Sequence, residues 1–237
     1  MITRAIEDRI NNALAKKKAV TIMGPRQVGK STLADAIIPK DAKVLEINGD
    51  NTDVQTMFVN VDEAKMKILI GNNNFLFVDE AQKIENVGNM LKIVAEKFKD
   101  VKIIVTGSSA FKLAEAVNES LTGRKREFKL YPLSFKEMAD DTSVLEESRM
   151  IDHRLIYGYY PEVVTSPGDE KEVLKELIDS YLYKDVMEEN NIAKPEKLVK
   201  LVQALAFQIG STVSATELAG LVGIDAKTVE RYIEILE

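Results

Sequence analysis

The segment that most limits how this chain can fold lies between residues 19 and 38. It begins with a short apolar and β-branched run, AVTIM, which is typical of a buried strand, and it ends with STLADAII, which has helical spacing. The loop between them fits G-x-x-x-x-G-K-[ST], a pattern whose glycines let successive backbone amides turn toward a phosphate. Because a strand precedes the loop and a helix follows it, we favour phosphate binding over a chance match in a glycine-containing turn.

The residues of this loop have separate expected roles. Lys30 can reach the β and γ phosphates of ATP, where it would also assist catalysis, and the Ser31 hydroxyl can coordinate a Mg²⁺ ion that bridges the same phosphates. The whole loop is expected to contact the nucleotide, through Gly24, Pro25, Arg26, Gln27, Val28, Gly29, Lys30, Ser31 and Thr32. The sequence therefore predicts a site for ATP and Mg²⁺.

Two carboxylates follow a second buried strand. The run FLFV at 75–78 is apolar without interruption and ends in Asp79 and Glu80. Ligands of open α/β sheets bind where the strands end, so both carboxylates should emerge beside the phosphate loop. We expect Asp79 to hold the Mg²⁺ ion and Glu80 to orient or deprotonate the attacking water. The alternative, a solvated acidic strand end, is weakened by the phosphate loop upstream.

The remaining pattern predicts an α/β fold. Further strands are expected at 44–48 and 101–107, with a helix at 86–99, so a parallel sheet should carry helices on both sides. From about residue 134 the strand pattern stops and helical segments take over. We therefore predict a P-loop ATPase domain over 1–135, a helical lid over 136–194 and a helix-turn-helix or partial winged-helix domain over 195–237.

Two further residues are candidates for catalysis. Ser108 follows the strand at 103–105 and could hydrogen-bond the γ phosphate or the attacking water, although a helix N-cap explains it nearly as well. Arg124 lies in the basic stretch 123–126 and could stabilise transition-state charge, either within its own chain or in a neighbouring subunit. A solvated basic loop is an equally good interpretation of that stretch.

The overall composition excludes several classes of partner. The net charge is −6, so any contact with DNA must come from a local patch of positive charge. The chain has no cysteine and one histidine, His153, which argues against disulfides and zinc sites. No uncharged apolar run approaches the roughly 20 residues that span a bilayer, so no membrane contact is expected and we place the chain in the cytoplasm.

The last residues, 214–237, have a helix-turn-helix pattern. Ser214 and Asp225 are candidate N-caps, and a small core is expected from Leu218, Leu221, Val222, Val229, Ile233 and Leu236. If the second helix binds DNA, we expect its contacts with the major groove to come from Lys227, Thr228 and Arg231. Three glutamates share that helix and oppose phosphate contact, so a structural role and DNA binding both stay open.

Several of these motifs, taken in order, resemble one protein family. They are GPRQVGKSTL, FLFVDEAQKI, IIVTGSSAFKL, LTGRKREFKLYPLSFKE, GYYPEV and SATELAGLVGIDAKTVERYIEILE. Together they resemble prokaryotic AAA+ type ATPases that carry a C-terminal domain called DUF4143. The resemblance implies that Asp79 and Glu80 form the Walker B pair, that Ser108 is a sensor and Arg124 a finger, and that Pro161 lies in a lid over the nucleotide. Since the sequence stops at Glu237, the wing and C-terminal domain of that family are expected to be absent, through truncation or in a short member.

The expected function is Mg²⁺-dependent ATP hydrolysis that moves the lid and the winged-helix domain. An alternative is a nucleotide-switched DNA-binding regulator in which hydrolysis is incidental. A small-molecule kinase is disfavoured because Glu80 suits water better than a substrate hydroxyl, and assembly into a homo-oligomer stays open.

Overall fold

The structure is a computed structural model of the whole chain, and it describes all residues except 1, 108–120, 180–191, 193 and 237. The described chain divides into two compact units, residues 1–168 and 169–237, which we treat separately. The helices at 135–165 belong to the first unit together with the sheet, so this division differs from the three domains expected above, whose limits stay a prediction.

The first unit is built on a five-stranded parallel sheet with the order β2-β3-β4-β1-β5. Its strands are β1 (Ala19–Met23), β2 (Val44–Asn48), β3 (Phe75–Asp79), β4 (Lys102–Gly107) and β5 (Lys125–Lys129). The first four were predicted. The edge strand β5 was missed because its sequence, KREFK, has four charged residues and buries only Phe128. The parallel sheet predicted from the uninterrupted apolar runs is thus confirmed.

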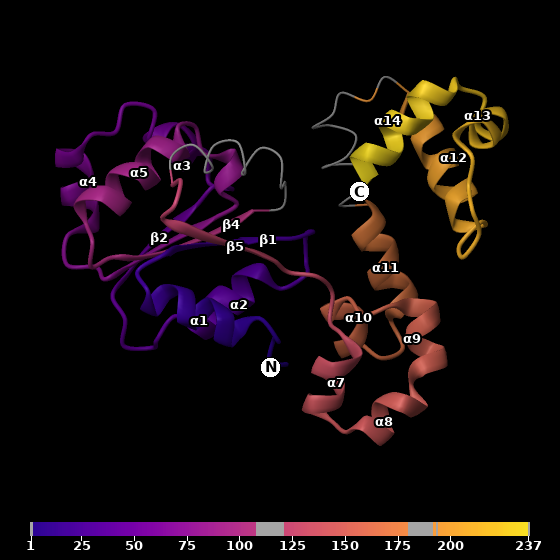
Figure 1. Cartoon of the computed structure of the whole chain (residues 1–237), viewed down its shortest axis with the longest axis horizontal. Coiled ribbons are helices and arrows are strands. Elements are labelled where there is room, and N and C mark those ends of the chain that lie inside the picture. The colour runs from indigo at the N-terminus through magenta and orange to yellow at the C-terminus, as the bar shows by residue number, and fades with distance from the viewer. Residues whose placement is uncertain (1, 108–120, 180–191, 193, 237) are drawn as a thin grey trace. The chain divides into compact units, whose positions relative to one another are not determined.

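Helices cover both faces of the sheet (Figure 1). The helices packed around it are α1 (Glu7–Ala15), α2 (Lys30–Ile37), α3 (Thr52–Met57), α4 (Glu63–Ile70) and α5 (Val87–Lys97), with a 3₁₀ turn at Ala81–Lys83. Each face of the sheet has its own hydrophobic core, and the side chains of β1 alternate between the two. Val20 and Ile22 pack with α1 and α2, whereas Ala19 and Met23 face the core that contains α4 and α5. All five residues of β1 are buried, which fixes the phosphate loop to the centre of the sheet.

Four short helices complete the first unit after the sheet: α7 (Phe135–Asp141), α8 (Val144–Arg149), α9 (Ile151–Tyr157) and α10 (Pro161–Thr165). Ser134 caps α7, because its hydroxyl accepts from the Glu137 amide while the Glu137 carboxylate accepts from the Ser134 amide. Arg154 of α9 bonds Glu147 of α8 at 3.1 Å, and both side chains are almost fully buried. The first contact fixes the start of α7, and the second joins α9 to α8.

The second unit is helical throughout its described part. It contains α11 (Glu170–Ile178), α12 (Pro195–Ala206), α13 (Ala215–Val222) and α14 (Ala226–Leu236). Helices α13 and α14 form the expected helix-turn-helix, and Asp225 caps α14 by accepting the Thr228 amide at 2.9 Å. Leu218, Val222 and Val229 are buried as predicted, but Leu221 is 63% exposed and its assignment to the core was wrong. The buried side of α13 is centred between Leu218, Ala219 and Val222. At 100° per residue, Leu221 lies about 100° away from that centre and so faces outward. A DNA-reading role for α14 stays a prediction.

No helix among the described residues is both long enough and apolar enough to cross a membrane.

Candidate functional site

The phosphate loop has the backbone conformation that its two glycines allow. A Cβ atom at Gly24 would lie 2.2 Å from the Leu130 carbonyl oxygen, so no larger residue fits where the loop leaves β1. Gly29 has a φ of +92°, in the left-handed region, directly before α2 begins at Lys30. The spacing of the motif is therefore explained by a close approach at one end of the loop and a left-handed turn at the other.

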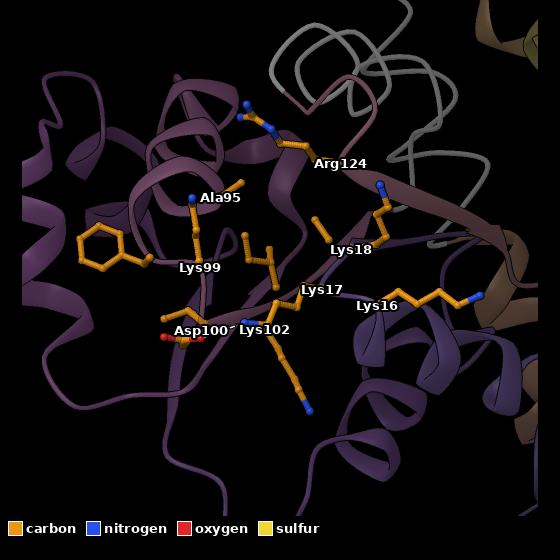
Figure 2. Close-up of a pocket in the computed structure, with 12 residues that line it drawn as sticks. Lys16, Lys17, Lys18, Ala95, Lys99, Asp100, Lys102 and Arg124 are labelled. Atoms are coloured by element: carbon orange, nitrogen blue, oxygen red, sulfur yellow. Dashed lines mark hydrogen bonds and ion pairs between the residues drawn. The ribbon is translucent and has the colours of Figure 1, made fainter.

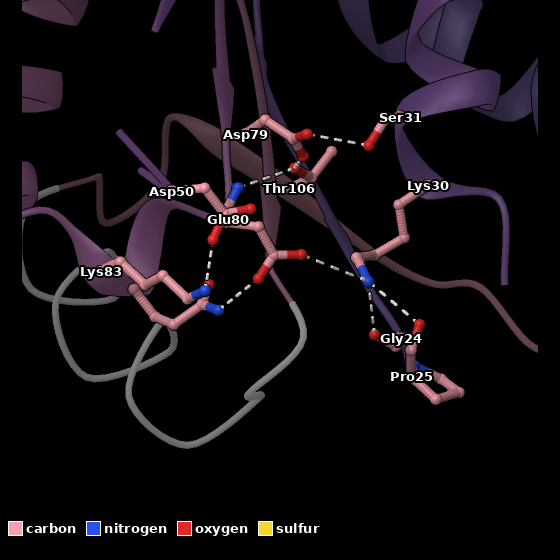
Figure 3. Close-up of polar contacts among 10 residues, drawn as sticks. Gly24, Pro25, Lys30, Ser31, Asp50, Asp79, Glu80, Lys83 and Thr106 are labelled. Atoms are coloured by element: carbon pink, nitrogen blue, oxygen red, sulfur yellow. Dashed lines mark hydrogen bonds and ion pairs between the residues drawn. The ribbon is translucent and has the colours of Figure 1, made fainter. Parts of the chain in front are cut away.

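Lys30 points back into this loop (Figure 3). Its Nζ donates to the carbonyl oxygens of Gly24 and Pro25, both at 3.0 Å, and lies 3.8 Å from Oε1 of Glu80. The residue is 5% exposed although it carries a charge, so its ammonium group is held in the hollow of the loop rather than in water. This is the place where a bound phosphate would meet it.

Asp79 is the last residue of β3, and its side chain connects the start of α2 to the sheet. Ser31 Oγ donates to Asp79 Oδ2 at 2.9 Å, and the Thr106 hydroxyl donates to Asp79 Oδ1. The order β3-β4-β1 explains this contact, because β4 separates Asp79 from the loop and Thr106 on β4 fills the gap between them. A hydroxyl and a carboxylate in contact at one edge of the sheet fit the oxygen ligands that Mg²⁺ takes.

Glu80 follows in a strained conformation. Its φ of +47° lies in the left-handed region, which is uncommon for a residue other than glycine. The Glu80 backbone also lies close to Gly49, since a Cβ atom on Gly49 would be 2.3 Å from the Glu80 carbonyl oxygen. Its carboxylate accepts a hydrogen bond from Gln82 Nε2 at 2.6 Å and faces Lys30. The turn therefore directs the carboxylate of Glu80 across the end of the sheet toward the phosphate loop (Figure 3).

A cavity of about 570 Å³ adjoins the loop within the first unit. Gly29 and Thr32 line it from the loop side, and Pro161 at the start of α10 lines it from the helical side. Much of the remaining wall is apolar, from Leu33, Ala36, Leu133, Met138 and Val164. The structure thus places Pro161 in the same cavity as Gly29 and Thr32, and its contact with a nucleotide stays a prediction.

Arg4 contacts this site and was missed by the sequence analysis. It is 8% exposed, and its guanidinium donates to the Val28 carbonyl at 3.0 Å, to the Tyr131 carbonyl at 2.6 Å and to the Glu137 carboxylate at 3.1 Å. Burial opposes ionisation of Glu137, but the amides of Ala5 and Ser134 and the Arg4 guanidinium outweigh it and hold the pKa of Glu137 below its ordinary value. The sequence carried no signal for these contacts, since an arginine and a glutamate 133 residues apart form no motif.

The structure places Arg124, one of the other two candidates, away from these residues. Ser108 lies outside the described residues. Arg124 precedes β5, so it lies at the amino edge of the sheet, about 16 Å of strand away from the edge that carries the loop, and it pairs with Glu96 at 2.8 Å. Within one chain the structure does not place Arg124 beside the phosphates, and its role in a neighbouring subunit stays a prediction.

Comparisons with known proteins match most of the chain to two domain families. Residues 16–139, more than half of the chain, match the AAA domain family AAA_14. Residues 148–237 match a domain of unknown function, DUF8612. The expected resemblance is therefore confirmed for the AAA domain, while a relation to proteins that carry DUF4143 stays an expectation.

Relatives and solved structures agree with this match. The chain is 26% identical to an uncharacterized protein of Methanocaldococcus jannaschii over 92% of this chain and 53% of that protein, and 28% identical to an uncharacterized protein of Haemophilus influenzae over 69% and 43%. It therefore spans about half the length of these curated relatives. The Walker-type ATPase of Pyrococcus abyssi superposes with a TM-score of 0.61 at 14% identity, over 99% of this chain and 89% of that one, which shows a shared fold.

Proposed function

This chain belongs to the AAA domain family, and on that premise we propose that it binds ATP and hydrolyses it with a Mg²⁺ ion at the phosphate site. The observation that carries the proposal is the 2.9 Å hydrogen bond between Ser31 and Asp79. It joins the phosphate loop to the acidic end of β3, so the residues needed for the phosphates, the ion and the water lie at one edge of the sheet.

Each residue has one task in the proposed reaction. Lys30 leaves the carbonyls of Gly24 and Pro25 and binds the β and γ phosphates, whose negative charge attracts it more strongly than neutral carbonyl oxygens do. Ser31 and Asp79 would hold the Mg²⁺ ion, which supplies positive charge to the phosphate oxygens when bound.

Glu80 accepts a proton from the water whose oxygen attacks the γ phosphorus, while the bond to the bridging oxygen breaks and ADP leaves. The carboxylate faces Lys30, which is the direction in which the γ phosphate would lie.

We further propose that the 570 Å³ cavity receives the nucleoside part of ATP. Its mostly apolar wall suits a base, and it opens beside Gly29, where the phosphates would begin. Pro161 would then contact the nucleotide from the helical side, so the presence of ATP would favour one position of α10. We also propose that a change in the position of α10 on ATP binding is coupled to α13 and α14.

ATP turnover by the full chain tests the proposal. The unaltered chain should hydrolyse ATP with Mg²⁺ and stop when the ion is removed by a chelator. Asp79→Asn should lose turnover, since it keeps the shape of the side chain but removes the charge that the ion needs. Asp41→Asn is the matched control, because Asp41 is an exposed aspartate in the turn after α2 and lies outside the cluster. Unchanged turnover in Asp79→Asn would overturn the assignment.

A further inference from the structure

A second pocket lies at the opposite edge of the sheet, and half of the residues that line it are cations (Figure 2). It has a volume of about 170 Å³ and lies where β1, β4 and β5 begin, a full strand length from the phosphate loop. Three separate segments supply its basic residues: Lys16, Lys17 and Lys18 after α1, Lys99 and Lys102 between α5 and β4, and Arg124 before β5.

Three of these cations stand in a row across neighbouring strands. Val20 pairs with Ile104 and Ala19 pairs with Lys125, so continuing both registers by one or two residues aligns Lys18 with Lys102 on one side and with Arg124 on the other. Adjacent strands are about 4.8 Å apart, so the backbones of these three residues form a row about 10 Å long.

Acidic residues neutralise only some of the positive charges in this pocket. Lys17 pairs with Asp100 at 3.0 Å and Arg124 pairs with Glu96, whereas Lys18 donates to the Gly123 carbonyl and Lys102 lies over the Phe75 ring. Over the described ranges, the structure gives no carboxylate partner to Lys16, Lys18, Lys99 or Lys102. Four uncompensated positive charges therefore share one pocket in a chain whose net charge is −6.

We propose that this pocket binds the phosphate backbone of a nucleic acid strand. A concave surface lined by one sign of charge concentrates ions of the opposite sign. A single phosphate would leave most of the cluster uncompensated. A row about 10 Å long instead spans about three successive phosphates, at 3.4 Å of helix axis per phosphate in one strand. A chain with a net negative charge needs a local basic patch to bind nucleic acid, and this pocket supplies one. It is assembled from segments far apart in the sequence.

The test is binding of the full chain to a fluorescent 20-base-pair DNA duplex and to the matching single strand, without nucleotide. If the three cations of the row each contact a phosphate, duplex affinity should fall about 40-fold between 50 and 200 mM salt. Lys18→Gln combined with Lys102→Gln should leave about one contact, and the fall should then be about three- to fourfold.

The matched control is Lys67→Gln combined with Lys136→Gln, which changes net charge equally at two exposed lysines outside the pocket. It should bind as the unaltered chain does. A second variant, Lys16→Gln combined with Lys99→Gln, removes pocket lysines that lie outside the row, and it should weaken binding less than Lys18→Gln combined with Lys102→Gln does.

Three results would overturn the proposal: no DNA binding at 50 mM salt, equal weakening in the pocket and control variants, or binding that is lost in Lys227→Gln with Arg231→Gln of α14 but kept in the pocket variant. Binding of inorganic polyphosphate without binding of DNA would overturn it as well. Because the assay contains no ATP and the pocket lies opposite the phosphate loop, its outcome is independent of the proposed hydrolysis.

Discussion

Replacing Arg4 with alanine should destabilise the sheet unit far more than breaking an ion pair on its surface. The side chains of Arg4 and Glu137 are 9% and 8% exposed, so water cannot take the place of either partner. Removing Arg4 leaves the Glu137 carboxylate without its countercharge and leaves the carbonyls of Val28 and Tyr131 without a donor. Removal of one partner from a buried pair costs about 3–5 kcal/mol, and we expect Arg4→Ala to fall in that range.

The pair of Lys17 and Asp100 supplies the control. Its contact distance of 3.0 Å is similar to that of the buried pair, but its side chains are 68% and 96% exposed. An exposed pair contributes about 0.2–1 kcal/mol, so Lys17→Ala should change the free energy of unfolding by less than about 1 kcal/mol. The two variants compare similar contacts that differ in burial.

Native-state hydrogen exchange at the amides of β1 and β4 is the appropriate assay, because it reports opening of the sheet unit by itself. Arg4→Lys should lie between the two alanine variants, since it keeps a positive charge beside Glu137 but cannot reach three acceptors. If Arg4→Ala costs no more than Lys17→Ala, the buried network does not stabilise this unit and the reasoning is wrong. ATP affinity should fall with Arg4→Ala, because Arg4 bonds the Val28 carbonyl inside the phosphate loop.

The other predictions concern pH and catalysis. The folded state holds the pKa of Glu137 below its ordinary value, so the unfolded state binds more protons in acid. The free energy of unfolding should therefore fall as the pH drops below about 4.3. Glu137→Gln should make that fall shallower, as measured by urea titrations from pH 7 to 3. Lys30→Ala should weaken ATP binding about 10- to 100-fold by calorimetry, and unchanged affinity would refute its contact with phosphate. Glu80→Gln should bind ATP normally but turn it over at least about a hundredfold more slowly, and normal turnover would remove Glu80 as the base.

Much of the fold could be predicted from the sequence because its signals are local. An apolar and β-branched run marked β1, an uninterrupted apolar run marked β3, and the glycine spacing marked the loop between β1 and α2. Edge strand β5 escaped prediction because a strand with one buried residue has no apolar run to mark it.

The candidate site divides in the same way. The sequence by itself predicted that Lys30, Ser31, Asp79 and Glu80 would lie together, since each stands at a fixed distance from a strand end and the carboxyl ends of parallel strands share one edge.

The tertiary structure alone decided which residues from distant parts of the chain lie side by side. Strand order places Thr106 between Asp79 and the loop, burial joins Arg4 to Glu137, and register aligns Lys18 with Lys102 and Arg124 at the edge opposite the one where Arg124 was first sought. These pairings depend on contacts between strands and helices far apart in the chain, and no local pattern in one segment encodes what another segment will bring beside it.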